Sequence, residues 1–120
     1  MAGKKIESWL THEFSTGCYP GKDYTEFQSH ARRDLRRICK ENDLGLHAFN
    51  KSHYEFSAVL KHTGTGAFVY VSIPDVRFFR NEWYNSVLYR TMEHDKDWTG
   101  GGNNRCCWPE LGERAAELVA

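Results

Sequence analysis

Hydrophobic and polar positions alternate with a helical period in the segment from Asp23 to Asn42. The apolar residues of this segment follow one another at spacings of three and four positions, which is the period of one helix face. They are Tyr24, Phe27, Ala31, Leu35 and Ile38. Asp23 is a suitable N-cap, and Asn42, Asp43 and Gly45 suit a left-handed helix end. The pattern predicts a helix over residues 23–42.

A period of two follows this helix and predicts strands. Apolar and polar side chains alternate over residues 53–61, and residues 67–73 are rich in β-branched and aromatic side chains. The turn Thr63-Gly64-Thr65-Gly66 between them suits a hairpin. Residues 86–91 form a further strand by the same criterion, and residues 46–49 add a short one. Together they predict a sheet within residues 46–92.

A second helix is predicted at the C-terminal end. Pro109 fits a first helical turn, and an apolar stripe follows it over residues 109–119. The order of helix, strands and helix predicts an α+β fold, a small antiparallel sheet of three to four strands with both helices on one face. With 120 residues, we expect a single domain over 1–120. Residues 1–20 lack a period and are either a late-packing helical turn or an arm toward a neighbouring subunit.

Composition limits the function classes. The 16 basic and 16 acidic residues cancel, which argues against a protein that coats DNA or RNA, so we expect no sequence-specific nucleic-acid partner. No apolar run reaches the roughly 20 residues of a membrane helix, and the N-terminus lacks the apolar core of a signal peptide. We therefore expect a cytoplasmic protein with no membrane partner.

The four cysteines indicate neither a disulfide framework nor a zinc site. Cys106 and Cys107 are adjacent and cannot easily bridge each other, while Cys18 and Cys39 lie in unlike contexts. We expect reduced thiols, and no metal or other cofactor.

The strongest functional signal is the loop from Arg90 to Arg105, between the last predicted strand and the last helix, which we name the 90–105 loop. Gly100, Gly101 and Gly102 allow close approach of a ligand to the backbone, and the two asparagines that follow supply amide groups. Its cations and one tryptophan are suited to phosphates and to a base. Neither standard glycine-phosphate motif is present, and the alternative is an ordinary surface loop.

The segment from Arg77 to Asn85 has a similar character, with four aromatic residues and no clear period. If it meets the 90–105 loop, aromatic rings can sandwich a base while cations hold phosphates. The predicted ligand-binding residues are Arg77, Phe78, Trp83, Tyr84, Arg90, Lys96, Trp98, Gly101, Asn103, Asn104 and Arg105. The alternative is that the aromatic residues close the core.

Catalysis and protein binding are the competing classes. Glu93, His94, Asp95 and Asp97 could supply an acid/base pair or a metal site, but their spacing matches no known motif, so we predict no catalytic residue and a protein that is not an enzyme. The predicted helix carries five cations on its outer face, Arg32, Arg33, Arg36, Arg37 and Lys40. They form either a solvated face or a patch that binds an acidic partner, such as a host defence nuclease that the protein would inhibit.

Three segments resemble a phage protein family. They are residues 68–77 (FVYVSIPDVR), 87–91 (VLYRT) and 96–104 (KDWTGGGNN). Over roughly residues 45–110 the chain resembles the phage Thoeris anti-defence sponges, small oligomeric proteins that sequester cyclic ADP-ribose-type immune signals and, in some members, cyclic oligonucleotides. The resemblance implies a non-enzymatic binder of a cyclic nucleotide in the cytoplasm of an infected bacterium, and it assigns no residue.

The aromatic content predicts self-association. Seven Phe, four Trp and six Tyr residues exceed what one small core readily hides. We expect a homo-oligomer, a dimer or higher, with the ligand site near a subunit boundary. The candidate interface residues are Ile6, Trp9, Leu10, Phe14, Phe78, Phe79, Trp83 and Tyr84.

Overall fold

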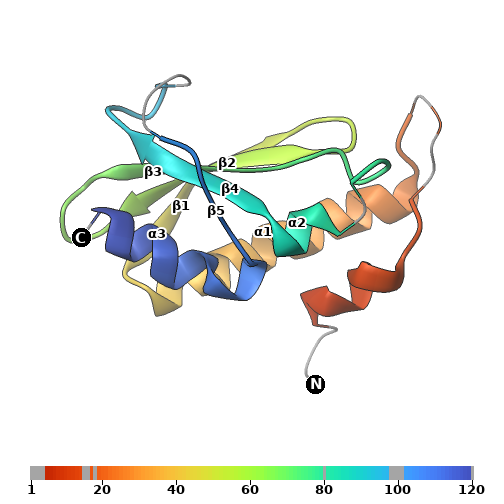
Figure 1. The fold of residues 1–120 in the computed structure, drawn as a ribbon, viewed down its shortest axis with the longest axis horizontal. Helices are drawn as coiled ribbons and strands as arrows, with labels where there is room; N and C mark the ends of the chain where they lie inside the picture. The colour runs from red at the N-terminus through yellow and green to blue at the C-terminus, as the bar shows by residue number, and fades with distance from the viewer. Residues whose placement is uncertain (1–4, 15–16, 18, 80, 98–101, 120) are drawn as a thin grey trace.

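A computed structural model describes residues 5–14, 17, 19–79, 81–97 and 102–119. Its elements, in chain order, are a 3-10 helix η1 (Ile6–Thr11), α1 (Lys22–Glu41), β1 (Leu44–Lys51), β2 (Phe56–His62), β3 (Phe68–Ile73), the short α2 (Glu82–Asn85), β4 (Val87–Met92), β5 (Asn104–Cys106), a 3-10 turn η2 (Trp108–Glu110) and α3 (Leu111–Val119). Figure 1 shows the sheet with α1 and α3 on one side of it.

The sheet is an antiparallel meander. Its five strands lie in the order β1-β2-β3-β4-β5, so that each pairs with its neighbours in sequence. The predicted α+β class is confirmed, but the sheet has one strand more than the predicted three to four. The additional strand, β5, lies within the segment that we predicted to be a loop. Three residues are too few to show a period, and only pairing with β4 makes them a strand.

The core lies between the sheet and the two long helices. Alternate strand residues point toward α1, and the predicted apolar face of α1 meets them. Phe27 and Leu35 from α1, and Leu60 and Val71 from the sheet, are fully buried. Trp108 at the start of the C-terminal helical segment is also buried, and its indole Nε1 donates a hydrogen bond of 2.6 Å to Asp34 of α1.

Helices α1 and α3 approach each other closely at Gly112. A Cβ atom at this position would lie 2.6 Å from Cγ2 of Ile38 and closer still to the amide of Asn42. That amide donates a hydrogen bond of 2.8 Å to the carbonyl of Ile38, which fixes its position at the end of α1. Only glycine leaves room for this crossing.

The N-terminal segment packs on its own chain. Ile6 and Phe14 are buried, and the ring of Trp9 stacks on Phe14 with centroids 5.9 Å apart. The described part of residues 1–20 is therefore a packed 3-10 turn, not an arm that extends to a neighbour. Asp23 is not the N-cap that we predicted. Helix α1 begins at Lys22 after Gly21, and the Asp23 carboxylate lies 2.7 Å from Nε2 of His12.

No helix in the described ranges is both long enough and apolar enough to cross a membrane.

Candidate functional site

The face of the sheet opposite the helices, which we name the open face, carries polar and aromatic side chains in cross-strand rows. The register gives one row as Asn50, Ser57, Ser72, Leu88 and Arg105, and the next as Ala48, Val59, Tyr70 and Arg90. These positions alternate with the core residues, because successive side chains of a strand point to opposite faces. The open face therefore combines hydroxyl groups, an aromatic ring and two arginines.

Arg90 and Arg105 are diagonal neighbours on the open face. Arg105 pairs with Leu88 across β4 and β5, and Leu88 precedes Arg90 by two residues on the same face. The Cα atoms of two residues in this diagonal relation lie about 7–8 Å apart. The pairing of β4 with β5 thus places the two terminal arginines of the loop at neighbouring positions on the open face.

Arg90 is almost fully buried, although it is charged. Its guanidinium lies 4.6 Å from the centroid of the Tyr70 ring, and its amino groups donate to the carbonyls of Thr91 and Asp97 at 3.2 Å. Only 5% of its surface is exposed. A buried arginine needs such partners, because desolvation of the charge is costly. Arg90 therefore connects Asp97 of the loop to Tyr70 on the open face.

Residues 93–97 lie over the open face, on the side of the sheet away from α1 and α3 (Figure 1). Asp95 approaches β1, where its carboxylate lies 3.1 Å from Nε2 of His47. The carboxylate of Asp97 accepts the backbone N–H of Glu93 at 3.0 Å. Lys96 is exposed at the tip of this segment. The described part of the loop is thus attached to both β1 and β4.

Two predicted site residues, Trp98 and Gly101, lie outside the described residues. Asn103 and Asn104 are exposed, and the side chain of Asn104 donates to the carbonyl of Gly102 at 3.1 Å. Asn104 pairs with Tyr89, so that it shares the face of a core residue and not the open face. Among the predicted site residues that the structure describes in this half of the loop, Arg105 is the one that the strand register places on the open face.

A cleft next to Tyr70 holds about 290 Å³. Its lining includes Asn50, Ser57, Tyr70 and Ser72, and Asn50 donates to the Ser57 hydroxyl at 3.4 Å. The volume is close to the lower end of small-molecule sites, roughly 300–1,000 Å³. Sequence reasoning missed these residues. They were the polar positions of predicted strands, which are ordinarily assigned to solvent, and only the register shows that they share one face with Arg105.

The second predicted cluster lies elsewhere. Residues 77–85 precede β4 and residues 93–97 follow it, so the six-residue strand separates these two segments by roughly 20 Å at about 3.3 Å per residue. Residues 77–85 therefore do not meet this part of the loop, whereas Arg105, at the other end of the loop, pairs with Leu88, three residues after Asn85. Arg77 pairs with Asp75 at 2.7 Å and stacks on Tyr54 at 4.2 Å. Hydrogen bonds from Arg77 lower the pKa of the Asp75 carboxyl below its ordinary value.

Trp83 is a core residue and not a plate for a ligand. It has no exposed surface, and its ring meets Phe27 at 5.0 Å and Trp108 at 5.8 Å. Tyr84 is half-buried against it at 5.4 Å. Phe78 is 68% exposed and lies 5.0 Å from the Arg77 guanidinium. The alternative that these aromatic residues close the core holds for Trp83 and not for Phe78.

The described part of the chain shows no assembled metal site, and two of its thiols have raised pKa values. No cluster of three or more His, Cys, Asp or Glu side chains there is arranged to hold a metal ion. Burial raises the pKa of Cys39 to about 12 and that of Cys106 to about 11. Both thiols are therefore protonated at neutral pH and are poor nucleophiles.

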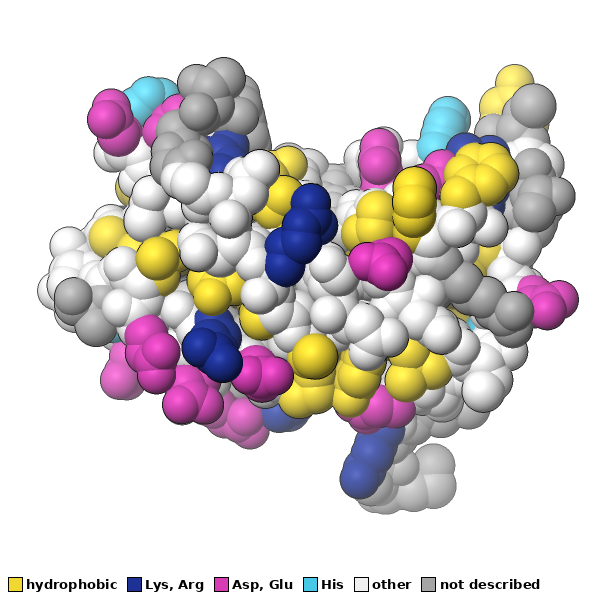
Figure 2. Space-filling view, in the orientation of Figure 1, with side chains coloured by type: hydrophobic (Ala, Val, Ile, Leu, Met, Phe, Trp, Pro, Cys, Tyr) yellow, Lys and Arg dark blue, Asp and Glu magenta, His cyan; other side chains and the backbone are white. Residues whose placement is uncertain are grey.

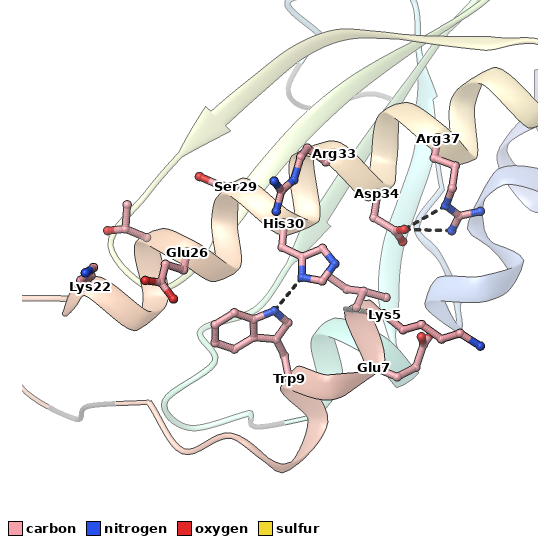
Figure 3. Close-up of a pocket in the computed structure, with 12 residues that line it drawn as sticks. Lys5, Glu7, Trp9, Lys22, Glu26, Ser29, His30, Arg33, Asp34 and Arg37 are labelled. Atoms are coloured by element: carbon pink, nitrogen blue, oxygen red, sulfur yellow. Dashed lines mark hydrogen bonds and ion pairs between the residues drawn. The ribbon is translucent and has the colours of Figure 1, made fainter. Parts of the chain in front are cut away.

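A larger groove lies between η1 and α1, on the helical side of the molecule (Figure 3). It encloses about 1200 Å³. Trp9 and His30 point toward each other within it, and the indole Nε1 donates to His30 Nδ1 at 3.0 Å. Asp34 and Arg37 form an ion pair farther along the groove.

Comparison with known proteins gives no match to a family model, a curated protein or a solved structure.

Proposed function

We propose that the protein binds a nucleotide on the open face of its sheet and withholds it without cleaving it. The proposal is supported by one relationship above all, the placement of the exposed Arg105 on the same face as Tyr70 and the serine row, with Arg90 packed on the Tyr70 ring. A nucleotide needs cations for its phosphates, a flat apolar surface for its base and hydroxyl or amide groups for its ribose. The open face offers each of these groups within neighbouring rows.

The roles follow from exposure. Arg105 is exposed and is the group that binds phosphate directly. Arg90 is buried on Tyr70 and acts by position, since it holds the tyrosine ring and the start of the loop in place. Ser57, Ser72 and Asn50 line the cleft and are suited to donate to ribose oxygens. The loop segment 93–97 closes one side of this surface.

The ligand class that we propose is a cyclic nucleotide of the ADP-ribose type, with cyclic oligonucleotides as the related class. This finer statement rests on the family resemblance of residues 68–77, 87–91 and 96–104, and on the small size of the cleft. In that role the protein acts in the cytoplasm of an infected bacterium, where it lowers the concentration of an immune signal. Binding alone suffices, since stacking of one base contributes about 1–3 kcal/mol and charged hydrogen bonds add similar amounts.

Retention of the ligand tests the proposal. The protein is incubated with cyclic ADP-ribose, separated from free nucleotide by gel filtration and denatured by heat, and the released material is analysed by mass spectrometry. Release of the intact nucleotide supports sequestration. Release of an altered nucleotide would make the protein an enzyme, and the absence of any retained cyclic ADP-ribose or cyclic oligonucleotide would exclude this function.

A further inference from the structure

The outer face of α1 carries its cations in two rows. Arg32, Arg36 and Lys40 follow one another at intervals of four residues, and Arg33 and Arg37 form a parallel row beside them. All five are exposed. Four residues of helix rise by about 6 Å, so the first row presents three cations along one line. This arrangement, which we name the cation ridge, faces away from the core.

The cation ridge is mostly uncompensated. Arg37 pairs with Asp34 at 3.0 Å and with Glu41 at 2.9 Å. Across the described ranges, Arg32, Arg33, Arg36 and Lys40 have no acidic side chain within ion-pair distance. The net charge of zero conceals this, because acidic groups gather elsewhere. Figure 2 shows such a gathering over η2 and α3, where Glu110, Glu113 and Glu117 are exposed.

The groove between η1 and α1 borders this ridge. Arg33 and Arg37 belong to both, and Trp9 supplies a partly exposed aromatic surface within the groove. His30 accepts the indole N–H at Nδ1, so that its remaining proton is at Nε2 in the neutral ring. The groove thus has an apolar surface and hydrogen-bond donors next to a line of positive charge.

We propose that the cation ridge and this groove together bind an acidic helical segment of a partner protein. Carboxylates spaced by four residues on the partner match Arg32, Arg36 and Lys40, since two helices share the same rise per residue. An apolar side chain of the partner packs on Trp9. This surface lies on the helical side of the molecule and is independent of the open face.

The groove lining favours a peptide over a nucleic acid. Glu7, Glu26 and Asp34 lie in the groove with the cations. A nucleic acid carries a negative phosphate in every unit of its backbone, and these carboxylates repel it. A helical peptide can instead place its acidic row on Arg32, Arg36 and Lys40 and present neutral donors and an apolar side chain to the groove. A surface that binds by phosphate neutralisation would not place acids among its cations.

Titration with a synthetic acidic peptide tests this inference. The probe is a helical peptide with Glu at every fourth position and one Leu beside that row. Calorimetry should give measurable binding, and NMR should show a shift of the Trp9 indole N–H signal. A peptide with Gln in place of Glu should bind at least about tenfold more weakly, because charged hydrogen bonds each contribute roughly 1.5–3 kcal/mol, where 1.4 kcal/mol is tenfold.

Matched variants locate the binding surface. The double variant Arg32→Gln/Arg36→Gln should lose at least about tenfold in affinity, while Arg36→Lys retains most of it and Arg114→Gln on α3 changes nothing. Thermal unfolding should be unchanged in all of them, because the side chains are exposed. Arg105→Gln should also bind the peptide normally, which separates this surface from the proposed nucleotide site.

Three results would overturn the inference. They are the absence of peptide binding, equal binding by the double variant, and tighter binding of a single-stranded oligonucleotide of the same charge. The last result would assign the surface to phosphate.

Discussion

Trp108 and Asp34 are joined by a hydrogen bond of 2.6 Å although 74 residues separate them in sequence. The indole is buried, and the other carboxylate oxygen of Asp34 accepts two bonds from Arg37. The Asp34 side chain thus fixes the start of the C-terminal helical segment and also neutralises the charge of Arg37 on its own helix. The side chain of Asp34 is 12% exposed, so that its interactions are only weakly screened.

Replacement of Asp34 should show the strength of this connection. Asp34→Ala leaves the buried indole N–H without an acceptor, which we expect to cost about 1–3 kcal/mol of unfolding free energy. Asp34→Asn retains an amide oxygen that can accept the same bond, so its loss should be smaller. Urea unfolding measures both. Glu41→Ala, which removes only an exposed ion pair with Arg37, is the control; an equal loss in all three variants would contradict the assigned role.

Gly112→Ala should destabilise the protein by crowding the contact between α1 and α3. The added Cβ meets Ile38 and the fixed amide of Asn42, and overpacking of this kind costs typically about 1–3 kcal/mol. Gly102→Ala is the matched control, since no atom lies within 4 Å of a Cβ there. Thermal melting of the two variants distinguishes them. A normal melting temperature for Gly112→Ala would mean that the helices separate easily.

Arg105→Gln should raise the dissociation constant for the nucleotide at least about tenfold, because a charged hydrogen bond contributes roughly 1.5–3 kcal/mol. Its stability should not change, since the side chain is exposed. Arg114→Gln, an exposed arginine on α3, should bind normally. Arg90→Gln should weaken both binding and folding, because Arg90 is buried on Tyr70. Normal nucleotide binding by Arg105→Gln would remove phosphate recognition from the open face.

Acid should weaken the Asp75–Arg77 pair. The pKa of Asp75 is lowered from its ordinary 3.8 by the hydrogen bonds of Arg77. A carboxyl with a depressed folded pKa contributes stability that is present above the unfolded pKa and is lost as pH falls through the folded one. The unfolding free energy should therefore decline below about pH 4, and Asp75→Asn should reduce this decline. Parallel slopes for the two proteins between pH 5 and pH 2 would refute the contribution.

Self-association is expected through a smaller patch than the sequence indicated. Ile6, Phe14 and Trp83 belong to the core, and among the described residues the large apolar side chains that remain exposed are Tyr19, Phe78 and Phe79. Light scattering at micromolar concentration should give at least twice the chain mass of 14.0 kDa. The double variant Phe78→Ser/Phe79→Ser should give the mass of one chain. A wild-type protein that is monomeric with and without nucleotide would exclude a shared site.

The accuracy of the sequence predictions follows from the length of each periodic pattern. Helix α1 and strands β2 to β4 are long enough for apolar side chains to repeat, and their predicted bounds differ from the structure by a few residues. Trp83 belongs to a four-residue helix, where no period exists, so that its burial could not be inferred. The fold class depends on the long periodic segments taken together and was therefore predictable.

The candidate site was predictable only in part. Arg90 and Arg105 were identified by their chemistry, and pairing of β4 with β5 brings them together. Ser57, Tyr70 and Ser72 were not, because their relation to Arg105 depends on the register across four strands. Sequence spacing does not give register between strands.

The meander order of the sheet also has a kinetic consequence. Each strand pairs with the strand next to it in the chain, so that β1 to β4 can assemble as successive hairpins with little loss of loop entropy. The contacts of η2 and α3 with earlier elements are different, because they close long segments of chain, such as the one between Asp34 and Trp108, which are 74 positions apart. We therefore expect α3 to dock late in folding, after the meander has formed.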